Sequence, residues 1–517
     1  MILIEVSQKT VEGEDTGDPI HVYTQFYLPV DGKRRLEILW CLKKNAGNPA
    51  IATITLLNER IYTDEELGVS SLKIRQVVIG ARLKFSDFFE RLSEGYNVLC
   101  NADIFFDETL ARVRRSDIHC TKKMYALLRY EYRGEDDLEE CPIFGPRNDS
   151  MDTWIIHSAQ GLTEEMRRGF RFFLGAPGCD NKVAYLFRIL GYTVYNDPVF
   201  IRTYHNHAEE TRRYALARVK PPYMLVAPAR MGMEDTADIY HYDRTNNRLM
   251  EYIRYKLASK APFVIPRIAG VENNSAMIGA QPTVDYEKFE GVWKYLKNNA
   301  GISVPTVESL REYSRFYLNA FHRCDIYASW EPWGHYIPHI QQSHDFITTN
   351  FPKPQIWAFG YDIFHYIHGT PWTHALRGKR LLIISPFVDL FEDNAYQIRL
   401  FPECTFVFLK PPQTQGEEYS GDWRGPFAGF CDEVRKLEFD VALCSCGGYG
   451  NPICGFIHSI GKSAIYVGGV LQMYFGVYGN RWLDERKDAV LMYMSDKWQR
   501  PSMKPRGYKS IENGCYW

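Results

Sequence analysis

Residues 98–107 carry the clearest chemical signal of the chain, because an apolar strand runs directly into three side chains that end in oxygen. The segment Val-Leu-Cys is followed by Asn101, Asp103 and Asp107. In an open α/β sheet, ligands bind beyond the carboxyl ends of the strands. Hard oxygen ligands beside a phosphate-bearing substrate suit Mg²⁺ or Mn²⁺. These residues therefore predict a metal site or, equally well, a solvated strand end that is closed by an Asx turn.

Residues 101–110 resemble the Asp-x-Asp region of the GT-A nucleotide-sugar glycosyltransferases, in its version Asn-x-Asp-Ile-x-Phe-Asp-x-Thr-Leu. Other segments are similar to the same family and come in its order, so that the likeness covers roughly residues 18–215. As an ordered set they are fairly specific, although each piece alone is weak. They are Tyr23–Phe26, Leu57–Glu59, Ala81–Leu83, Met151–Ile156, 175–185 and 204–208.

The resemblance implies roles for several side chains. Asp103 would be the metal carboxylate, with Asn101 placing the donor ribose or a metal-bound water. A late histidine would close over the diphosphate and bind the metal, and His207 fits that position slightly better than His205. Asp152 matches the Asp-x-Trp of the family and would be the general base of an inverting transfer, or else a turn or N-cap residue. The donor pocket would contain Thr24, Asn58, Glu59 and Arg82, and the acceptor or sugar would meet Asp180 and Asn181.

The C-terminal half has a second pattern, in which glycine turns join strands to helices. Residues 441–452 and 462–472 both show it, and the resulting helix N-termini can hold phosphate, although the glycines would also permit tight turns and close packing alone. Roughly residues 240–485 resemble a Rossmann-like domain that is related to the GT-D glycosyltransferases. The Asp-x-Glu motif of those enzymes reads Gly-Val-Glu at 270–272, without the first acid. The second candidate site comprises Arg267, Glu272, Gly447, Gly448, Tyr449, Gly468, Gly469 and Gln472.

Length, charge and cysteine usage limit the class of protein. A chain of 517 residues is expected to form about two to four domains. A net charge of −2 gives no attraction to nucleic acid or to an anionic membrane. The twelve cysteines are scattered and favour free thiols in a reducing compartment. Because no leader or membrane span is evident, we expect a cytoplasmic protein, whose oligomeric state the sequence leaves open.

The alternation of strands and helices predicts an α/β protein with two Rossmann-like domains. We expect a GT-A-like domain with a mostly parallel sheet over residues 1–217 and a GT-D-like, doubly wound domain over 218–517. The charged stretch 208–223 would connect them, and the aromatic stretch 330–337 would stack sugar rings or pack a core. Expected strands of the first domain are 21–27, 50–57, 72–79, 96–102, 125–132 and 153–157, and expected helices are 36–45, 85–92 and 180–190, the last with Asp180 and Asn181 as a possible cap.

These patterns predict a glycosyltransferase that moves a sugar from a nucleotide sugar, UDP-linked by preference, to a glycan acceptor. The first domain would be inverting and dependent on Mn²⁺ or Mg²⁺, and the second would be another transferase, as in bacterial and large-DNA-virus proteins of glycan synthesis. One alternative makes the second domain a non-catalytic glycan-binding or scaffolding module. The other is a nucleotide-sugar-modifying enzyme, such as an epimerase or methyltransferase, but the first strands lack a Gly-x-Gly-x-x-Gly turn.

Overall fold

The chain divides into two units. The computed structural model describes residues 2–207, 216–231, 242–285, 287, 290–329, 338–362, 370–391, 400–416 and 421–517. Unit 1 contains Met1–Asp238 and Glu485–Tyr493, and unit 2 contains Ile239–His365, Thr370–Asp484 and Met494–Trp517. Residues 208–215 of the expected connection and the aromatic stretch 330–337 lie outside the described residues. The domain boundary near residue 217 stays a prediction.

Unit 1 is built on a seven-stranded sheet in the order β10-β7-β9-β5-β2-β3-β4. Strand β9 runs antiparallel to both of its neighbours, and the other pairs are parallel. The mostly parallel α/β sheet expected from the sequence is therefore confirmed. Its strands are β2 (Ile20–Thr24), β3 (Ile51–Asn58), β4 (Ile74–Val78), β5 (Tyr96–Cys100), β7 (Lys123–Leu127), β9 (Thr153–His157) and β10 (Thr193–Tyr195).

A second, three-stranded sheet of unit 1 has the order β6-β11-β8, with β6 (Ile104–Phe106), β11 (Thr203–Asn206) and β8 (Tyr130–Tyr132). The strand expected over 125–132 is thus two strands that belong to different sheets. The chain changes sheet at Leu128 and Arg129, where the backbone N–H of Leu128 donates to Asn196 Oδ1 at 2.9 Å. A parallel pair, β1 (Ile2–Val6) with β12 (Tyr223–Ala227), completes the strands described in this unit.

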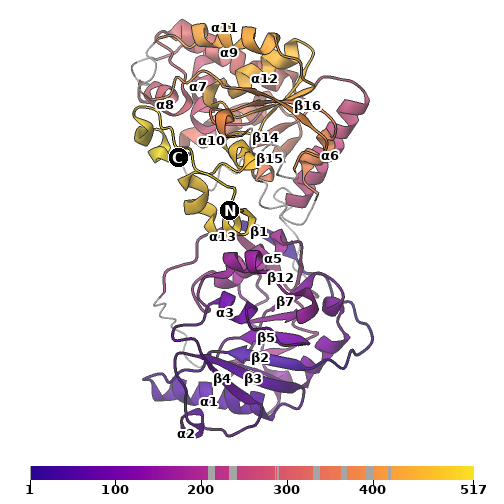
Figure 1. Cartoon of the computed structure of the whole chain (residues 1–517). Coiled ribbons are helices and arrows are strands. Elements are labelled where there is room, and N and C mark those ends of the chain that lie inside the picture. The colour runs from indigo at the N-terminus through magenta and orange to yellow at the C-terminus, as the bar shows by residue number, and fades with distance from the viewer. Residues whose placement is uncertain are drawn as a thin grey trace. The chain divides into compact units, whose positions relative to one another are not determined.

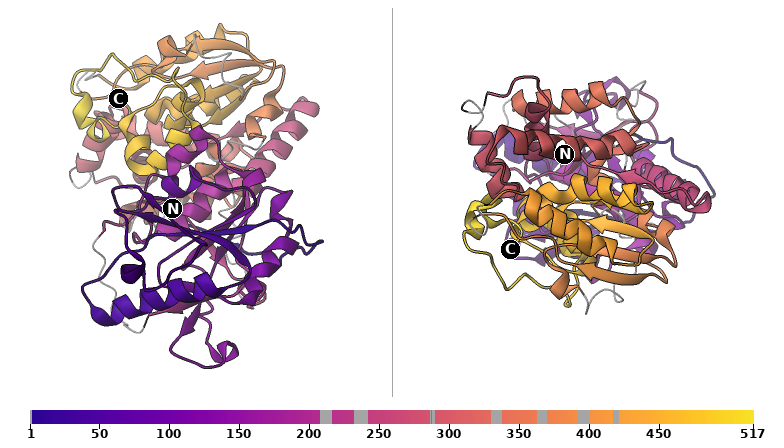
Figure 2. Two further views of the ribbon diagram at one scale, coloured as in Figure 1. Left: turned by 60° about the horizontal axis from the view of Figure 1, so that its bottom comes forward. Right: turned by 90° about the horizontal axis from the view of Figure 1, so that it is seen from above.

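Helix α1 (Gly32–Gly47) lies beside β3 (Figures 1 and 2). It begins at Asp31, whose side chain accepts from the Arg34 N–H, as a good N-cap does. Its buried residues Ile38, Cys41, Leu42 and Asn45 follow helical spacing and form one inward face. The other α-helices of unit 1 are α2 (Asp64–Leu67), α3 (Phe85–Phe89), α4 (Glu164–Arg167) and α5 (Cys179–Ile189).

Unit 2 contains an all-parallel sheet in the order β13-β19-β18-β16-β17. The order reverses at β16, because β17 lies on one side of it and β18 on the other, as in a doubly wound sheet. Figure 2 shows these strands, mostly in orange, from two directions. They are β13 (Val264–Ile265), β16 (Arg380–Ile384), β17 (Thr405–Leu409), β18 (Val441–Cys444) and β19 (Ser463–Tyr466).

Helices surround this sheet, and α9 packs against both α7 and α12 (Figure 1). A short parallel pair, β14 (Tyr327–Ser329) with β15 (Gln355–Trp357), forms a separate small sheet, which Ala328 links to the chain just after β13 by backbone hydrogen bonds with Pro266 and Ile268. None of the helices in the described part of the chain is long and apolar enough to cross a bilayer. The α-helices described in unit 2 are α6 (Tyr242–Ala258), α7 (Gly270–Gly279), α8 (Glu290–Ala300), α9 (Val307–Arg323), α10 (Pro338–Asn350), α11 (Arg424–Arg435) and α12 (Gly450–Ser459). Helix α13 (Asn480–Tyr493) begins in unit 2, and its residues from Glu485 onward belong to unit 1.

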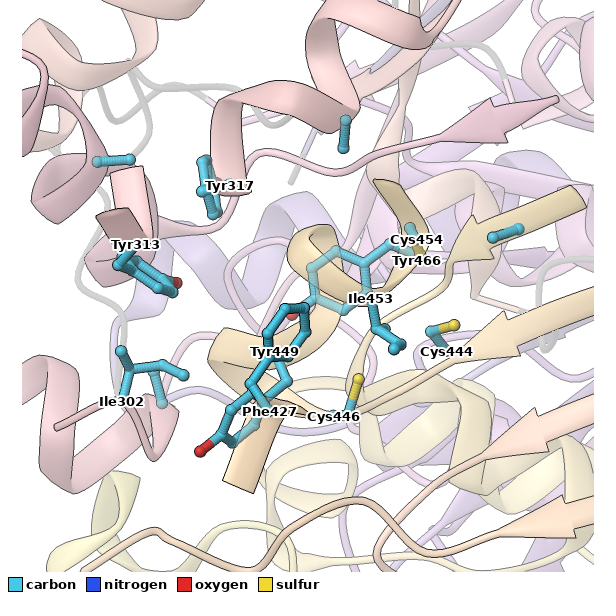
Figure 3. Close-up of a cluster of buried hydrophobic side chains, with 14 of the residues drawn as sticks. Ile302, Tyr313, Tyr317, Phe427, Cys444, Cys446, Tyr449, Ile453, Cys454 and Tyr466 are labelled. Carbon is cyan, nitrogen blue, oxygen red and sulfur yellow. The ribbon is translucent and has the colours of Figure 1, made fainter. Parts of the chain in front are cut away.

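The core of unit 2 is rich in aromatic rings and thiols (Figure 3). The rings of Phe427 and Tyr449 stack with their centroids 6.2 Å apart, and Cys444, Cys446 and Cys454 are buried beside them. All twelve cysteines of the chain are free. The expected free thiols are therefore present, and they act here as small apolar side chains that fill the space between β18 and α12.

We expect Gly448→Ala to destabilise unit 2 by about 1–3 kcal/mol, since overpacking forces neighbouring groups to move. A Cβ at this position would lie 2.2 Å from Ile302 Cγ1 and 2.9 Å from the Ala300 carbonyl oxygen. Gly429→Ala is the matched control, because a Cβ there meets nothing within 4 Å in helix α11 and should stabilise by up to about 1 kcal/mol. Thermal unfolding followed by circular dichroism compares the two, and equal midpoints would contradict the packing described.

Candidate functional site

Asp103, His205 and His207 form a cluster in unit 1 whose ligand atoms all lie within 4.8 Å of one another. Asp103 follows β5 and directly precedes β6, while His205 lies in β11 opposite Ile104. Residues two apart on an extended chain face the same side, so His207 joins His205 on the side of Asp103. The pairing of β11 with β6 therefore brings together side chains that are about a hundred positions apart in the sequence.

The cluster fits a divalent metal ion. Asp103 Oδ1 is buried and has no hydrogen-bond partner among the described residues, which is costly for a carboxylate oxygen unless a ligand pairs with it. A set of one carboxylate and two imidazoles leaves coordination positions open for substrate oxygens. Such a mixed set suits Mn²⁺ or another first-row ion better than Mg²⁺, which prefers oxygen ligands alone.

The second oxygen of Asp103 contacts cationic groups of the chain itself. Oδ2 accepts a hydrogen bond from the Arg34 guanidinium and lies 3.1 Å from His205 Nε2. Burial acts to raise the pKa of Asp103, but His205 and Arg34 together hold that pKa well below its usual range. Sequence reasoning missed Arg34, which lies in the first turn of α1, 69 positions from Asp103, and no motif links the two.

The two histidines differ in charge. His205 lies between two carboxylates, because its Nδ1 is 3.1 Å from Glu131 Oε2 in the neighbouring strand β8. Burial acts to lower the pKa of His205, yet Asp103 and Glu131 raise that pKa to about 9. Burial and the positive charge of Arg34 lower the pKa of His207. His207 is thus neutral and ready to ligate, whereas His205 must release a proton before it binds a metal.

Asp152, the expected general base, is held tightly by its neighbours. Its Oδ2 accepts a hydrogen bond from Arg129 Nη1, and its Oδ1 accepts one from Asn101 Nδ2 at 2.8 Å. Arg129 is 1% exposed. The structure therefore brings Asn101 and Asp152 together, and it adds Arg129, which could have been noticed only as a charged residue at the end of an apolar strand.

Asp180 and Asn181 lie at the start of helix α5, beside Asp152. The Asp180 carboxylate accepts from the backbone N–H groups of Met151 at 3.3 Å and Asn181 at 3.0 Å. Burial, aided by the negative charge of Asp152, raises the pKa of Asp180 to about 7. Asn181 Oδ1 is buried without a hydrogen-bond partner among the described residues. The N-cap of α5 is Gly178, which makes no side-chain cap hydrogen bond. Asp180 therefore lies in the first turn of the helix and is not its N-cap, and Asn181 beside it has spare hydrogen-bonding capacity.

The four expected donor-pocket residues lie at the carboxyl ends of neighbouring strands or follow them. Thr24 ends β2 and shares with Asn101 a cavity of about 10 Å³, which is the size of one water. Asn58 is used by the fold, since its side chain accepts from Phe26 N–H at 3.0 Å. Arg82 is exposed and donates to the Leu174 carbonyl at 3.2 Å, and Glu59 is exposed at the end of β3.

Asp107 has a structural role as a helix cap. Its side chain caps the 3₁₀ helix Glu108–Arg115 by accepting from the Thr109 N–H at 2.9 Å, and it also accepts from Tyr204 Oη at 2.9 Å. The Asx-turn alternative therefore describes Asp107, while Asp103 is the member of the motif that faces the histidines.

In unit 2, side chains of the protein itself occupy the space beside the glycines at 468 and 469. The guanidinium of Arg267 approaches Gly468, where an added Cβ would lie 1.7 Å from Nη1, and donates to the Val467 carbonyl at 3.1 Å. The ring of Tyr516 lies against Gly469. The backbone carbonyl of Tyr516 accepts a hydrogen bond from Gln472 Nε2 at 3.5 Å.

The remaining members of the second candidate site are buried or partly buried around the same strand ends. Gly447 and Gly448 allow close contact with Ala300 and Ile302, and Tyr449 belongs to the core. Glu272 follows β13 in the first turn of α7, where burial raises its pKa to about 7 despite the attraction of Arg267.

Comparison with known proteins adds little to this geometry. No family model matches the chain, and no curated protein matches it. The mannosyltransferase PcManGT from Pyrobaculum calidifontis, in complex with GDP-Man and Mn²⁺, aligns at 11% identity and a TM-score of 0.25 over 48% of this chain and 66% of that one. A selenomethionine-substituted domain of unknown function, DUF1792, aligns at 12% identity and a TM-score of 0.27 over 53% and 94%. The chain thus spans slightly less than two thirds of the mannosyltransferase, and likeness this low carries no argument about activity.

The charge on His205 makes the stability of metal-free unit 1 depend on pH. Its pKa is raised from 6.5 to about 9, so its contribution is complete below pH 6.5 and is lost as the pH rises through about 9, up to about 3 kcal/mol. Urea unfolding in chelator between pH 6 and 9.5 should show this decline in the wild type and in the His119→Gln control. The decline should be smaller in His205→Gln, and an identical decline in all three proteins would contradict the assignment.

Proposed function

We propose that unit 1 is a metal-dependent glycosyltransferase, which moves a sugar from a nucleotide sugar, UDP-linked by preference, to a glycan acceptor in the cytoplasm. The observation that carries the proposal is the cluster of Asp103, His205 and His207 at the carboxyl edge of a mostly parallel sheet. Thr24 and Asn101 lie at the same edge. The resemblance of residues 101–110 to the GT-A motif supports the same activity.

The residues of the cluster suit the departure of a diphosphate. Asp103, His205 and His207 would hold the ion, and a bound divalent cation would neutralise the charge that develops on the leaving group. Arg34 contributes a second positive charge beside Asp103. Its planar guanidinium matches the geometry of phosphate oxygens, and its side chain is 20% exposed, so it can reach a substrate at the mouth of the site.

The acceptor hydroxyl must lose a proton to a carboxylate, and the contacts favour Asp180 over Asp152 for that task. Both oxygens of Asp152 already accept hydrogen bonds from side chains. Asp180 accepts from two backbone amides, and a pKa of about 7 is close to the optimum for a general base at neutral pH. Asp152 then fixes the position of Asn101 and adds the negative charge that raises the pKa of Asp180. A single base of this kind corresponds to direct, inverting displacement.

For unit 2, the packing favours the alternative of a non-catalytic glycan-binding or scaffolding module over a second transferase. Ile302 and Tyr516 occupy the space beside Gly448 and Gly469, where a phosphate-binding turn would need open backbone amides. The turn at residues 270–272 also lacks the first acid of an Asp-x-Glu pair.

Donor hydrolysis tests the metal site and the number of activities together. We expect Mn²⁺-dependent release of nucleoside diphosphate from one of a panel of nucleotide sugars, with UDP sugars the first to be tried. Asp103→Asn should lower that rate by at least about 100-fold, the scale of a lost electrostatic group, while the exposed Asp64→Asn control keeps it. A donor that Asp103→Asn still hydrolyses would reveal a second active site, and unchanged hydrolysis of every donor would refute the metal assignment.

The pH profile of transfer distinguishes the two carboxylates. If Asp180 is the base, kcat/KM rises with pH through about 7, and Asp180→Asn removes this limb and slows transfer by about 10²–10⁴-fold. Asp152→Asn should keep the limb and move it to lower pH, because the negative charge of Asp152 raises the pKa of Asp180. Loss of the limb in Asp152→Asn, with its retention in Asp180→Asn, would return the role of base to Asp152.

A further inference from the structure

A chain of charged hydrogen bonds leads away from the metal cluster. His205 bridges Asp103 and Glu131, at 3.1 Å from each. Glu131 Oε1 accepts from Arg129 Nε at 2.8 Å, and Arg129 Nη1 donates to Asp152. Negative and positive groups therefore alternate without a gap from the candidate metal ligand to the carboxylate beside the candidate base.

We infer that Glu131 and Arg129 are positioning residues that couple the metal site to the acceptor side of unit 1. Glu131 orients the ring of His205, and Arg129 holds Glu131 and Asp152 in one fixed arrangement. The inference rests on the proposed function for the meaning of the two ends, and it goes beyond that function by making metal affinity depend on Asp152.

The placement of Arg129 supports its linking role. It lies at the junction where the chain leaves β7 of the large sheet and enters β8 of the small one. A guanidinium has its donors in a rigid plane, so two carboxylates bound to one Arg129 are fixed relative to each other. The ring of Phe144 packs against the guanidinium, 4.0 Å from the centroid, and restricts its movement further.

The placement of Glu131 supports its effect on the metal. It is the register partner of His205 in the parallel pairing of β8 with β11, and its Oε2 lies 3.1 Å from His205 Nδ1. A carboxylate that accepts from the far nitrogen of a histidine fixes the tautomer and orientation of the ring. Loss of such a partner lowers metal affinity by about 10–100-fold.

Burial makes the chain rigid. Side-chain exposure along it is 1% for Arg129, 7% for His205, 8% for Asp103, 12% for Asp152 and 17% for Glu131. Breaking one link leaves a buried charge without its partner, which the protein relieves by moving the remaining groups. A change at Asp152 should therefore reach His205 through Arg129 and Glu131.

Mn²⁺ binding to the full-length chain, measured by electron paramagnetic resonance of the free ion at fixed pH and without substrate, tests this coupling. Glu131→Gln should raise the Kd for Mn²⁺ by about 10–100-fold. Asp152→Asn, which touches none of the three candidate ligands, should raise it at least about 3-fold, and Arg129→Lys should do the same. Arg147→Lys is the matched control, because Arg147 stacks on the same Phe144 ring, 4.7 Å from its centroid, but pairs with Asp149.

A double-mutant cycle separates coupling from simple loss of stability. In the Glu131→Gln background, Asp152→Asn should have no further effect on the Kd, because the path is already broken. Equal effects of Asp152→Asn in both backgrounds, or none in the wild type, would overturn the inference while Mn²⁺ binding itself upheld the metal site. A wild type that binds no Mn²⁺ would instead refute the proposed function and the inference together. The cycle needs no Arg129 variant, so it decides the question even where Arg129→Lys does not fold.

Discussion

The candidate site depends on one constraint, which is that the charge of Asp103 is buried. A carboxylate whose side chain is 8% exposed is stable only with positive partners close to it, and the chain supplies Arg34 and the protonated His205. Glu37 and Glu131 balance those two cations in turn. Adding a metal cation to such a balanced group requires positive charge to leave, so His205 would give up its proton when the ion binds.

The fold creates this constraint because the chain passes twice from the large sheet of unit 1 into the small one. Strand β5 ends at Cys100, the chain turns through Asn101 and Asp103, and β6 begins the small sheet at Ile104. Strand β7 passes to β8 through Arg129 in the same way. Both crossings place charged side chains at the junction of the two sheets. Strand pairing is interrupted at this junction, so the charged side chains neutralise one another. The candidate site residues lie at this junction because the regular strand structure is interrupted there.

The sequence predicted what is local and missed what is distant. Continuous apolar strands were recognisable, as was Asp103 at the end of β5, and the α/β class with mostly parallel sheets is confirmed. Arg34, Glu131 and Arg129 were missed because their partners are 69, 74 and 23 positions away. The pairing of β8 with β11 brings Glu131 to His205, the pairing of β7 with β9 brings Arg129 to Asp152, and the packing of α1 near β6 brings Arg34 to Asp103. The break at Arg129 was also invisible, since Tyr125–Tyr132 reads as one strand by composition. The roles of the predicted site residues stay predictions.

Asp152 and Asp180 are two neighbouring carboxylates that have different surroundings and would have different roles in acid–base chemistry. They lie side by side, yet Arg129 and Asn101 donate to the oxygens of Asp152, while the donors to Asp180 among the described residues are backbone amides. Neighbouring carboxyl groups that have such different environments are typical of acid–base sites. Arg129 is then needed twice, because it pairs with Asp152 next to Asp180 and holds Glu131 against His205. An arginine this deeply buried adds little to the stability of a fold, since a well-packed apolar residue often stabilises it equally well. Stability alone therefore does not explain Arg129.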